Sequence, residues 1–159
     1  MSATATLVAF DPGVSDDAQA LRARLAPEDS SVAATYQGLA WELQEAALEA
    51  AVPNWDGYGG KPVERGTAIA ARAFLRALQP TWPMPKILVD ADGDIWFQWQ
   101  RDSSRTFAVA FGPSGAAHYA GLLGRSRTHG EETTVNERLL EVVARSLAEL
   151  YPDALRVTA

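Results

Sequence analysis

The chain has 159 residues, of which 47% are hydrophobic and 21% are charged, so it has the size and composition of one folded domain and cannot be disordered throughout. It contains no cysteine and two histidines, which excludes disulfides, thiolate chemistry and a histidine-rich metal cage; we expect no metal site and no cofactor. Fourteen basic against twenty acidic residues give a net charge of −6, which argues against general nucleic-acid binding.

The acidic residues are concentrated toward the N-terminus. Residues 1–60 contain nine acidic and two basic residues, whereas residues 61–130 contain five acidic and nine basic residues. The first ten residues lack the basic start of a secretory signal, and the chain has no run of roughly 18 apolar residues that could span a bilayer. We therefore expect a cytoplasmic protein without a membrane-spanning segment.

The chain is predicted to begin with a loosely attached arm. Proline and glycine among small polar residues favour such an arm over residues 1–31, ahead of a single domain over residues 32–159. Two helices follow, because apolar residues recur three and four positions apart over residues 35–51 and again over residues 67–79. Thr67 is the expected N-cap of the second helix, and a proline follows the end of each helix.

The middle of the chain changes to the alternating pattern of β-strands. The pair Asp92-Gly93 is a two-residue turn signal between a short apolar run and a stretch in which large apolar residues alternate with other residues. Polar turns separate further alternating stretches. The predicted strands cover residues 87–89, 95–100, 107–111 and 116–121.

A last helix is predicted after the strands. The capping-box pattern of Thr134 and Glu137 opens it, and five leucine and valine residues form one apolar face behind the box. Two helices, an antiparallel meander of about four strands and a final helix predict an α+β fold, with the helices packed on one face of the sheet.

The connector between the first two helices is the most unusual part of the sequence. Residues 54–60 read Asn-Trp-Asp-Gly-Tyr-Gly-Gly. The glycines allow backbone conformations that are closed to other residues, and Trp55 and Tyr58 are costly side chains to leave in a passive linker. This segment, here called the aromatic loop, therefore has a structural or a functional purpose.

The aromatic loop also carries a family resemblance. Together with residues 92–99, which read Asp-Gly-Asp-Ile-Trp-Phe-Gln-Trp, it resembles a group of small bacterial proteins that share an NWDGYGA-like loop, a helix and a DGxIxFxW hairpin. Gly60 stands where alanine is usual in that group. The resemblance covers residues 54–121, and it implies a fold pattern without implying an activity.

Two interpretations of the aromatic loop remain open at the level of sequence. In the structural one, Asn54 or Asp56 caps a turn and Trp55 plugs the edge of the core. In the functional one, Trp55 and Tyr58 anchor a protein partner and Asp56 makes a charged contact, because Trp and Tyr are enriched among the residues that dominate binding energy.

Trp96 poses a similar choice on the predicted sheet. It alternates with residues that must face the helices, so it lies on the outer face among glutamines. It either packs across neighbouring strands or marks a contact surface, such as the seam of a homodimer. Arg101 and Arg105 flank the next turn, where solvated charges are the ordinary finding and a contact with an anion is the alternative.

The sequence lacks the familiar catalytic and metal-binding motifs. Residues 90–94 look like the start of a calcium loop, yet the glycine and glutamate that such a loop needs at its sixth and twelfth positions are absent. No nucleophile elbow, phosphate loop or dinucleotide fingerprint occurs. One arrangement stays open: paired carboxylates such as Asp56 and Glu64, or an aspartate of the hairpin, with His118 or His129 as acid or base.

Three functions follow, of which the first is favoured. It is a non-enzymatic protein-binding role of the antitoxin, immunity or inhibitor type, with the acidic surface steering the chain to a basic protein partner. The second is a small hydrolase that uses the carboxylates and a histidine. The third is a structural subunit that self-associates through the Trp96 face. The expected binding residues are Asn54, Trp55, Asp56, Tyr58 and Trp96, and no catalytic residue is assigned.

Overall fold

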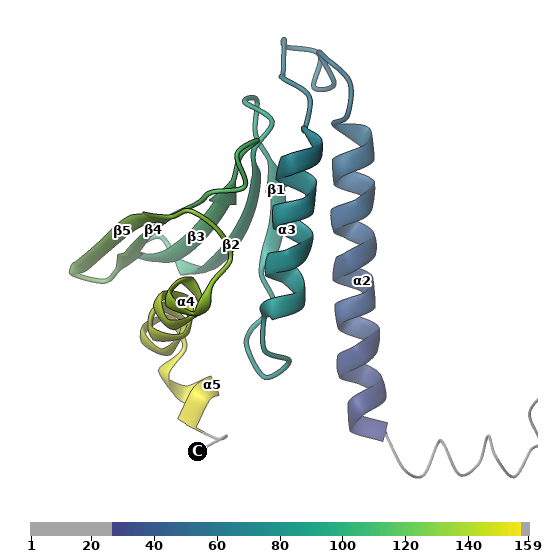
Figure 1. The fold of residues 1–159 in the computed structure, drawn as a ribbon. Coiled ribbons are helices and arrows are strands. Elements are labelled where there is room, and N and C mark those ends of the chain that lie inside the picture. The colour runs from purple at the N-terminus through teal and green to yellow at the C-terminus, as the bar shows by residue number, and fades with distance from the viewer. Residues whose placement is uncertain (1–26, 157–159) are drawn as a thin grey trace, which may run out of the picture. The chain divides into compact units, whose positions relative to one another are not determined.

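A five-stranded antiparallel sheet with helices is the main feature of the computed structural model, which describes residues 27–156 (Figure 1). Residues 1–26 of the predicted arm lie outside the described part, and residues 27–31 belong to the first described helix. The helices are α2 (Pro27–Glu49), α3 (Arg65–Ala77), α4 (Glu137–Leu150) and α5 (Pro152–Arg156). The strands are β1 (Lys86–Val89), β2 (Ile95–Asp102), β3 (Arg105–Phe111), β4 (Ala117–Leu123) and β5 (Ser126–Glu132).

The chain divides into two units, residues 1–37 and residues 38–159. Of the first unit the structure describes residues 27–37, which form the N-terminal part of α2. The second unit contains the rest of α2, the aromatic loop, the sheet and the remaining helices. Every site described below lies in this second unit.

The sheet is a meander in which each strand pairs antiparallel with the next strand of the chain. The predicted α+β class is confirmed, whereas the predicted number of four strands is wrong. The missed strand is β5, which pairs with β4 along its whole length. Its sequence Ser-Arg-Thr-His-Gly-Glu-Glu contains no large apolar residue, because an edge strand here packs little side-chain surface into the core.

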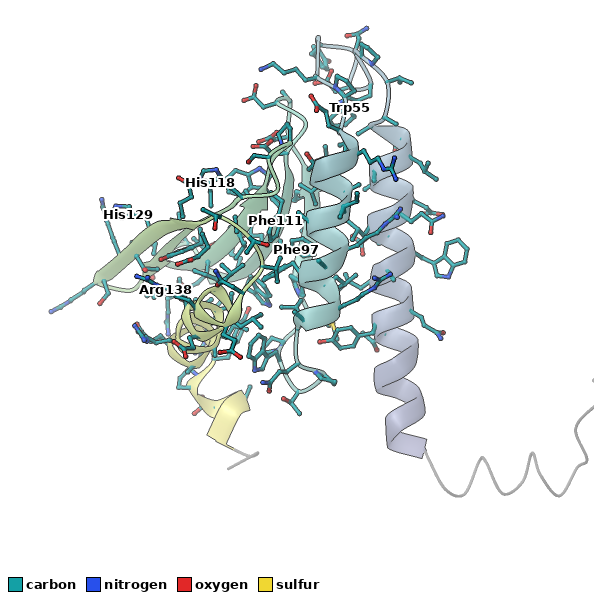
Figure 2. The ribbon with its side chains drawn as sticks, in the orientation of Figure 1. Trp55, Phe97, Phe111, His118, His129 and Arg138 are labelled. Atoms are coloured by element: carbon teal, nitrogen blue, oxygen red, sulfur yellow. The ribbon has the colours of Figure 1, made fainter. Side chains whose placement is uncertain are left out.

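The core forms where α3 and α4 cover the same face of the sheet (Figure 1). Phe74 of α3 is fully buried, and its ring centroid lies 5.0 Å from that of Phe97 and 5.2 Å from that of Phe111. Figure 2 shows these two sheet residues between the strands and α3. Trp99 completes the cluster at 6.5 Å from Phe74, and its indole nitrogen donates a hydrogen bond to the Pro83 carbonyl. Edge-on aromatic packing of this kind adds to the energy of burial.

The structure corrects the predicted starts of three helices. Helix α2 begins at Pro27 and not near residue 35. Helix α3 begins at Arg65, so Thr67 lies inside its first turn, and the Thr67 hydroxyl is buried without a hydrogen-bond partner. The helix starts earlier because the extended segment before it ends at Glu64. Helix α4 is capped by Asn136, whose side chain accepts from the Leu139 amide, so the expected capping box at residue 134 is not formed.

Replacing Phe74 with alanine tests the aromatic core. We expect Phe74→Ala to lower the free energy of unfolding by about 3–5 kcal/mol, because it leaves a cavity between α3 and the sheet. Denaturant unfolding measures the effect. The matched control is Ile69→Ala on the exposed side of α3, which should cost less than about 0.5 kcal/mol. Equal losses in the two variants would show that α3 is not held by this cluster.

Candidate functional site

The aromatic loop is closed by hydrogen bonds among its own residues. The Asn54 amide donates to the Gly60 carbonyl at 2.8 Å, and the Asn54 side-chain oxygen accepts from the Gly59 amide at 2.7 Å. Asn54 has a positive φ of 61°, and Gly57 and Gly59 have φ values of 78° and 90°. These left-handed conformations are natural for glycine and tolerated by asparagine, which explains the residue types at these three positions.

Asp56 organises the second half of the loop. One of its carboxylate oxygens accepts from the Tyr58 amide at 2.9 Å and from the Gly60 amide at 2.8 Å. These two hydrogen bonds hold the pKa of Asp56 below its ordinary value. A side chain at Gly60 would place its Cβ 2.8 Å from the Asp56 carboxyl carbon, so the carboxylate would have to move if residue 60 were alanine.

The loop is also fixed to the turn between β1 and β2. The Lys61 amide donates to the Ala91 carbonyl at 2.8 Å, and the Lys61 ammonium lies 2.9 Å from a carboxylate oxygen of Asp92. That contact raises the pKa of Lys61. Gly93 has no side chain, which allows the Pro62 carbonyl to come within 2.5 Å of where a Cβ would stand. The loop therefore has the β1–β2 turn as a fixed support.

The four predicted binding residues of the loop thus separate into two groups. Asn54 and Asp56 make hydrogen bonds that build the loop, and the Trp55 indole nitrogen donates to the Lys61 carbonyl at 3.0 Å (Trp55 is labelled in Figure 2). Tyr58 differs, because 95% of its surface is exposed. Contacts within the chain therefore account for Asn54, Trp55 and Asp56, whereas the Tyr58 side chain is exposed and stays a predicted binding residue.

Helix α2 carries a second apolar stripe, which we had not predicted. Trp41 and Leu48 are seven residues apart, nearly two helical turns, so they share one face, and they are 64% and 66% exposed. The buried residues Leu43 and Ala50 lie on the opposite face. Val52, 57% exposed, follows the end of the helix. The sequence does indicate this second stripe, because Trp41 and Leu48 are seven residues apart and both lie outside the apolar stripe that forms the core face.

Acidic residues line this exposed face. Glu42, Glu45 and Glu49 are exposed within a few positions of Trp41 and Leu48. The sequence from residue 38 to residue 60 contains no lysine or arginine. We call Trp41, Leu48 and these glutamates the acidic α2 face.

Trp96 lies on the outer face of the sheet, away from α3 and α4. Its indole nitrogen donates to an oxygen of Asp90 at 2.8 Å, and the side chain is half-buried. The other oxygen of Asp90 accepts from the amides of Asp92 and Asp94, so the turn fixes the carboxylate and the carboxylate fixes the indole. Trp96 also lines a groove of about 550 Å³ on this face.

The two arginines beside the β2–β3 turn interact with the chain itself. Arg101 donates from its guanidinium to the Leu150 carbonyl at 3.0 Å, near the C-terminal end of α4, where a positive charge is favourable. Arg105 lies 2.8 Å from an oxygen of Asp102. Contacts within the fold therefore account for both side chains.

Of the histidines and carboxylates of the hydrolase hypothesis, His118 lies close enough to Asp94 to affect its pKa, whereas Asp56 is held in the aromatic loop. His118 of β4 has its Nδ1 atom 3.9 Å from an oxygen of Glu131 on β5, and both side chains are exposed. Burial raises the pKa of Asp94, the neighbouring Asp90 and Asp92 raise it further, and His118 lowers it. His129 lines the outer groove, whereas Asp56 is bound to loop amides. Within the part of the chain that the structure describes, no three acidic or histidine side chains gather closely enough to hold a metal ion.

No protein-family model, no curated protein and no solved structure matches the chain. None of the helices in the described part is both long enough and apolar enough to cross a membrane.

Charge on Asp56 is expected to stabilise the loop in a pH-dependent way. Because the folded pKa lies below the ordinary value of about 3.9, this stabilisation is present above about pH 4 and is lost as the pH falls through the lower folded pKa. We expect Asp56→Asn to lower the melting temperature at neutral pH, with the difference from the wild type shrinking below about pH 3. A thermal melt at several pH values measures it.

The control for this experiment is Glu45→Gln, which removes one negative charge from an exposed position outside the loop. Its melting temperature should follow that of the wild type at every pH. A difference between Asp56→Asn and the wild type that is constant down to about pH 2 would contradict the stabilising role of the Asp56 charge.

Proposed function

We propose that this protein binds a basic protein partner, in the manner of antitoxins, immunity proteins and inhibitors, and catalyses no reaction of its own. The observation that carries the proposal is Tyr58, which is almost fully exposed on a loop whose other characteristic side chains are engaged by the chain itself. An exposed Tyr on a rigid support loses little conformational entropy on binding, so it is a favourable anchor.

The acidic α2 face supports the proposal that the partner is basic. Trp41 and Leu48 are exposed apolar residues nearly two turns apart on one face of α2, and the glutamates beside them would pair with lysine or arginine. The face is continuous along the chain with the aromatic loop, because residues 50–53 alone separate the end of α2 from Asn54. A partner bound at the C-terminal end of α2 could therefore also contact Tyr58, which follows soon after the helix in the chain.

The same charges disfavour self-association through this face. In a dimer with two-fold symmetry each acidic α2 face would lie against its own copy, so the glutamates of one chain would meet those of the other. Opposed like charges cost energy unless a counter-charge intervenes. A basic partner removes this cost, which is why we favour it over a homodimer at α2.

The hydrolase and the self-associating subunit remain the alternatives. Asp56 uses one carboxylate oxygen to hold two loop amides, so a hydrolase built on Asp56 would act through its other oxygen. Self-association through Trp96 would use the outer face of the sheet, which is separate from the acidic α2 face. We therefore assign the partner-binding role to Tyr58 and α2.

Tyr58→Ala tests the proposal directly. The tagged full-length chain is used to capture a partner from an extract of its own host at moderate salt, and the purified partner is then titrated against each variant. We expect one partner in stoichiometric amount, and Tyr58→Ala should weaken its binding by at least about 30-fold, or about 2 kcal/mol. The melting temperature of the variant should stay unchanged, because the side chain is exposed.

Ile69→Ala is the matched control, since Ile69 is an exposed apolar residue on a different helix. Its affinity for the captured partner should equal that of the wild type. Absence of any stoichiometric partner, or a Tyr58→Ala variant with full affinity and a lower melting temperature, would contradict the proposal and return Tyr58 to a structural role.

A further inference from the structure

The outer face of the sheet has a trough of small residues along its centre. Ala108 of β3 and Ala120 of β4 lie directly opposite each other in the strand register, with the larger side chains of Gln98 and His129 on the flanking strands of the same row. Because side chains in one row point to the same face, two alanines between longer neighbours leave a depression. This is the groove of about 550 Å³ that Trp96 lines.

One wall of the groove is rigid and aromatic. Trp96 and Leu88 face each other across β2 and β1 and both line the groove. The hydrogen bond from the Trp96 indole to Asp90 fixes the ring, so it offers a preformed apolar surface. A fixed indole is well suited to hold a flat ring by stacking or by edge contact.

The opposite wall carries positive charge. Arg127 and His129 of β5 line it, and none of the described residues that line the groove is an aspartate or a glutamate. In a chain with twenty acidic and fourteen basic residues, a groove of this composition is electrostatically distinct from the acidic α2 face. An occupant with a negative group at this wall would be stabilised by Arg127, whose planar guanidinium can donate two hydrogen bonds to a carboxylate or a phosphate.

We infer that this groove binds a small planar aromatic anion, with its ring against Trp96 over the alanine floor and its acidic group toward Arg127 and His129. Trp96 and Arg127 are three strands apart and offset by four residues along the strand, so their backbones lie about 20 Å apart, with His129 between them, and all three side chains line the groove. A volume of about 550 Å³ suits a ligand of one or two fused rings with a carboxylate or a phosphate. The site is independent of the proposed partner surface.

A second copy of the chain fits the groove less well. A symmetric contact between two outer faces would bring the cationic walls of both copies into one interface, where Arg127 would face a groove without carboxylates. A separate small anion meets no such repulsion. The measurement below nevertheless includes the mass of the protein in solution.

The test is a fluorescence titration of the full-length protein with 8-anilino-1-naphthalenesulfonate, an aromatic anion that emits strongly in apolar surroundings. The variant Ala108→Leu fills the floor of the groove, and Ala120→Leu fills it from the neighbouring strand. We expect each to weaken binding at least about tenfold, and Arg127→Gln to weaken it about fivefold. Arg125→Gln in the adjacent turn and Trp41→Ala on α2 should change binding less than twofold.

Competition then identifies the class of anion. Displacement of the probe by adenosine monophosphate assigns a phosphate-bearing ligand, and displacement by indole-3-acetate assigns a carboxylate; either result supports the site. The neutral analogue N-phenyl-1-naphthylamine should bind more weakly than the sulfonate in the wild type and equally in Arg127→Gln.

Three results would overturn the inference. In the first, both filled variants bind the probe as tightly as the wild type. In the second, Trp41→Ala loses probe binding and the filled variants keep it. In the third, light scattering finds a dimer that Ala108→Leu dissociates, and no anion binds. The melting temperatures of the variants show that each is folded. Because the two filling substitutions are on different strands, one variant still tests the groove if the other does not fold.

Discussion

The packing of Phe74 against Phe97, Phe111 and Trp99 is the interaction on which the rest of the second unit depends. It is the place where a short helix is held to the sheet by side chains that are fully or almost fully buried. The aromatic loop leads into α3 through an extended segment that ends at Glu64. Because the cluster fixes α3, it also fixes where the loop must end, and the hydrogen bond from Lys61 to Ala91 fixes the loop against the sheet.

This arrangement separates the side chains that support the loop from the one that is exposed. Asn54 and Asp56 use their oxygens to satisfy loop amides, and Trp55 satisfies a carbonyl, so the loop needs no partner to keep its conformation. Tyr58 remains as the exposed side chain of a closed structure. The same separation occurs on the outer face, where Asp90 fixes Trp96 and leaves the groove beside it open.

Much of the fold was predictable from the sequence, because the helices of the core and the first four strands bury one face each and therefore leave a periodic apolar pattern. Strand β5 was not predictable in this way, because its residues are polar on both faces and its pairing with β4 is visible only in the tertiary structure. Helix starts were misplaced where capping depends on the preceding chain, as at Thr67 and Asn136.

The candidate site was predicted in part. The sequence indicated the loop and Trp96 as candidate sites. Only the three-dimensional structure distinguishes the exposed Tyr58 from the residues that build the loop. Helix α2 was assigned one apolar face although it has two, because the periodic pattern of Leu43 and Ala50 satisfied the expectation of a core helix. The exposed Trp41 and Leu48 then went unnoticed. The outer groove depends on which residues stand opposite one another across strands, and register is not readable from a single strand.

The proposal is that the acidic α2 face attracts a basic partner, and the association rate of the captured partner tests this attraction most directly. Raising the salt from about 0.05 M to about 0.5 M shortens the screening length from about 14 Å to about 4 Å, so the on-rate should fall steeply. The variant Glu45→Lys with Glu49→Lys should lose most of this dependence. The pair Glu141→Lys with Glu149→Lys changes the net charge equally on α4 and should retain it. An on-rate that responds neither to salt nor to the α2 pair would contradict a basic partner at the acidic α2 face.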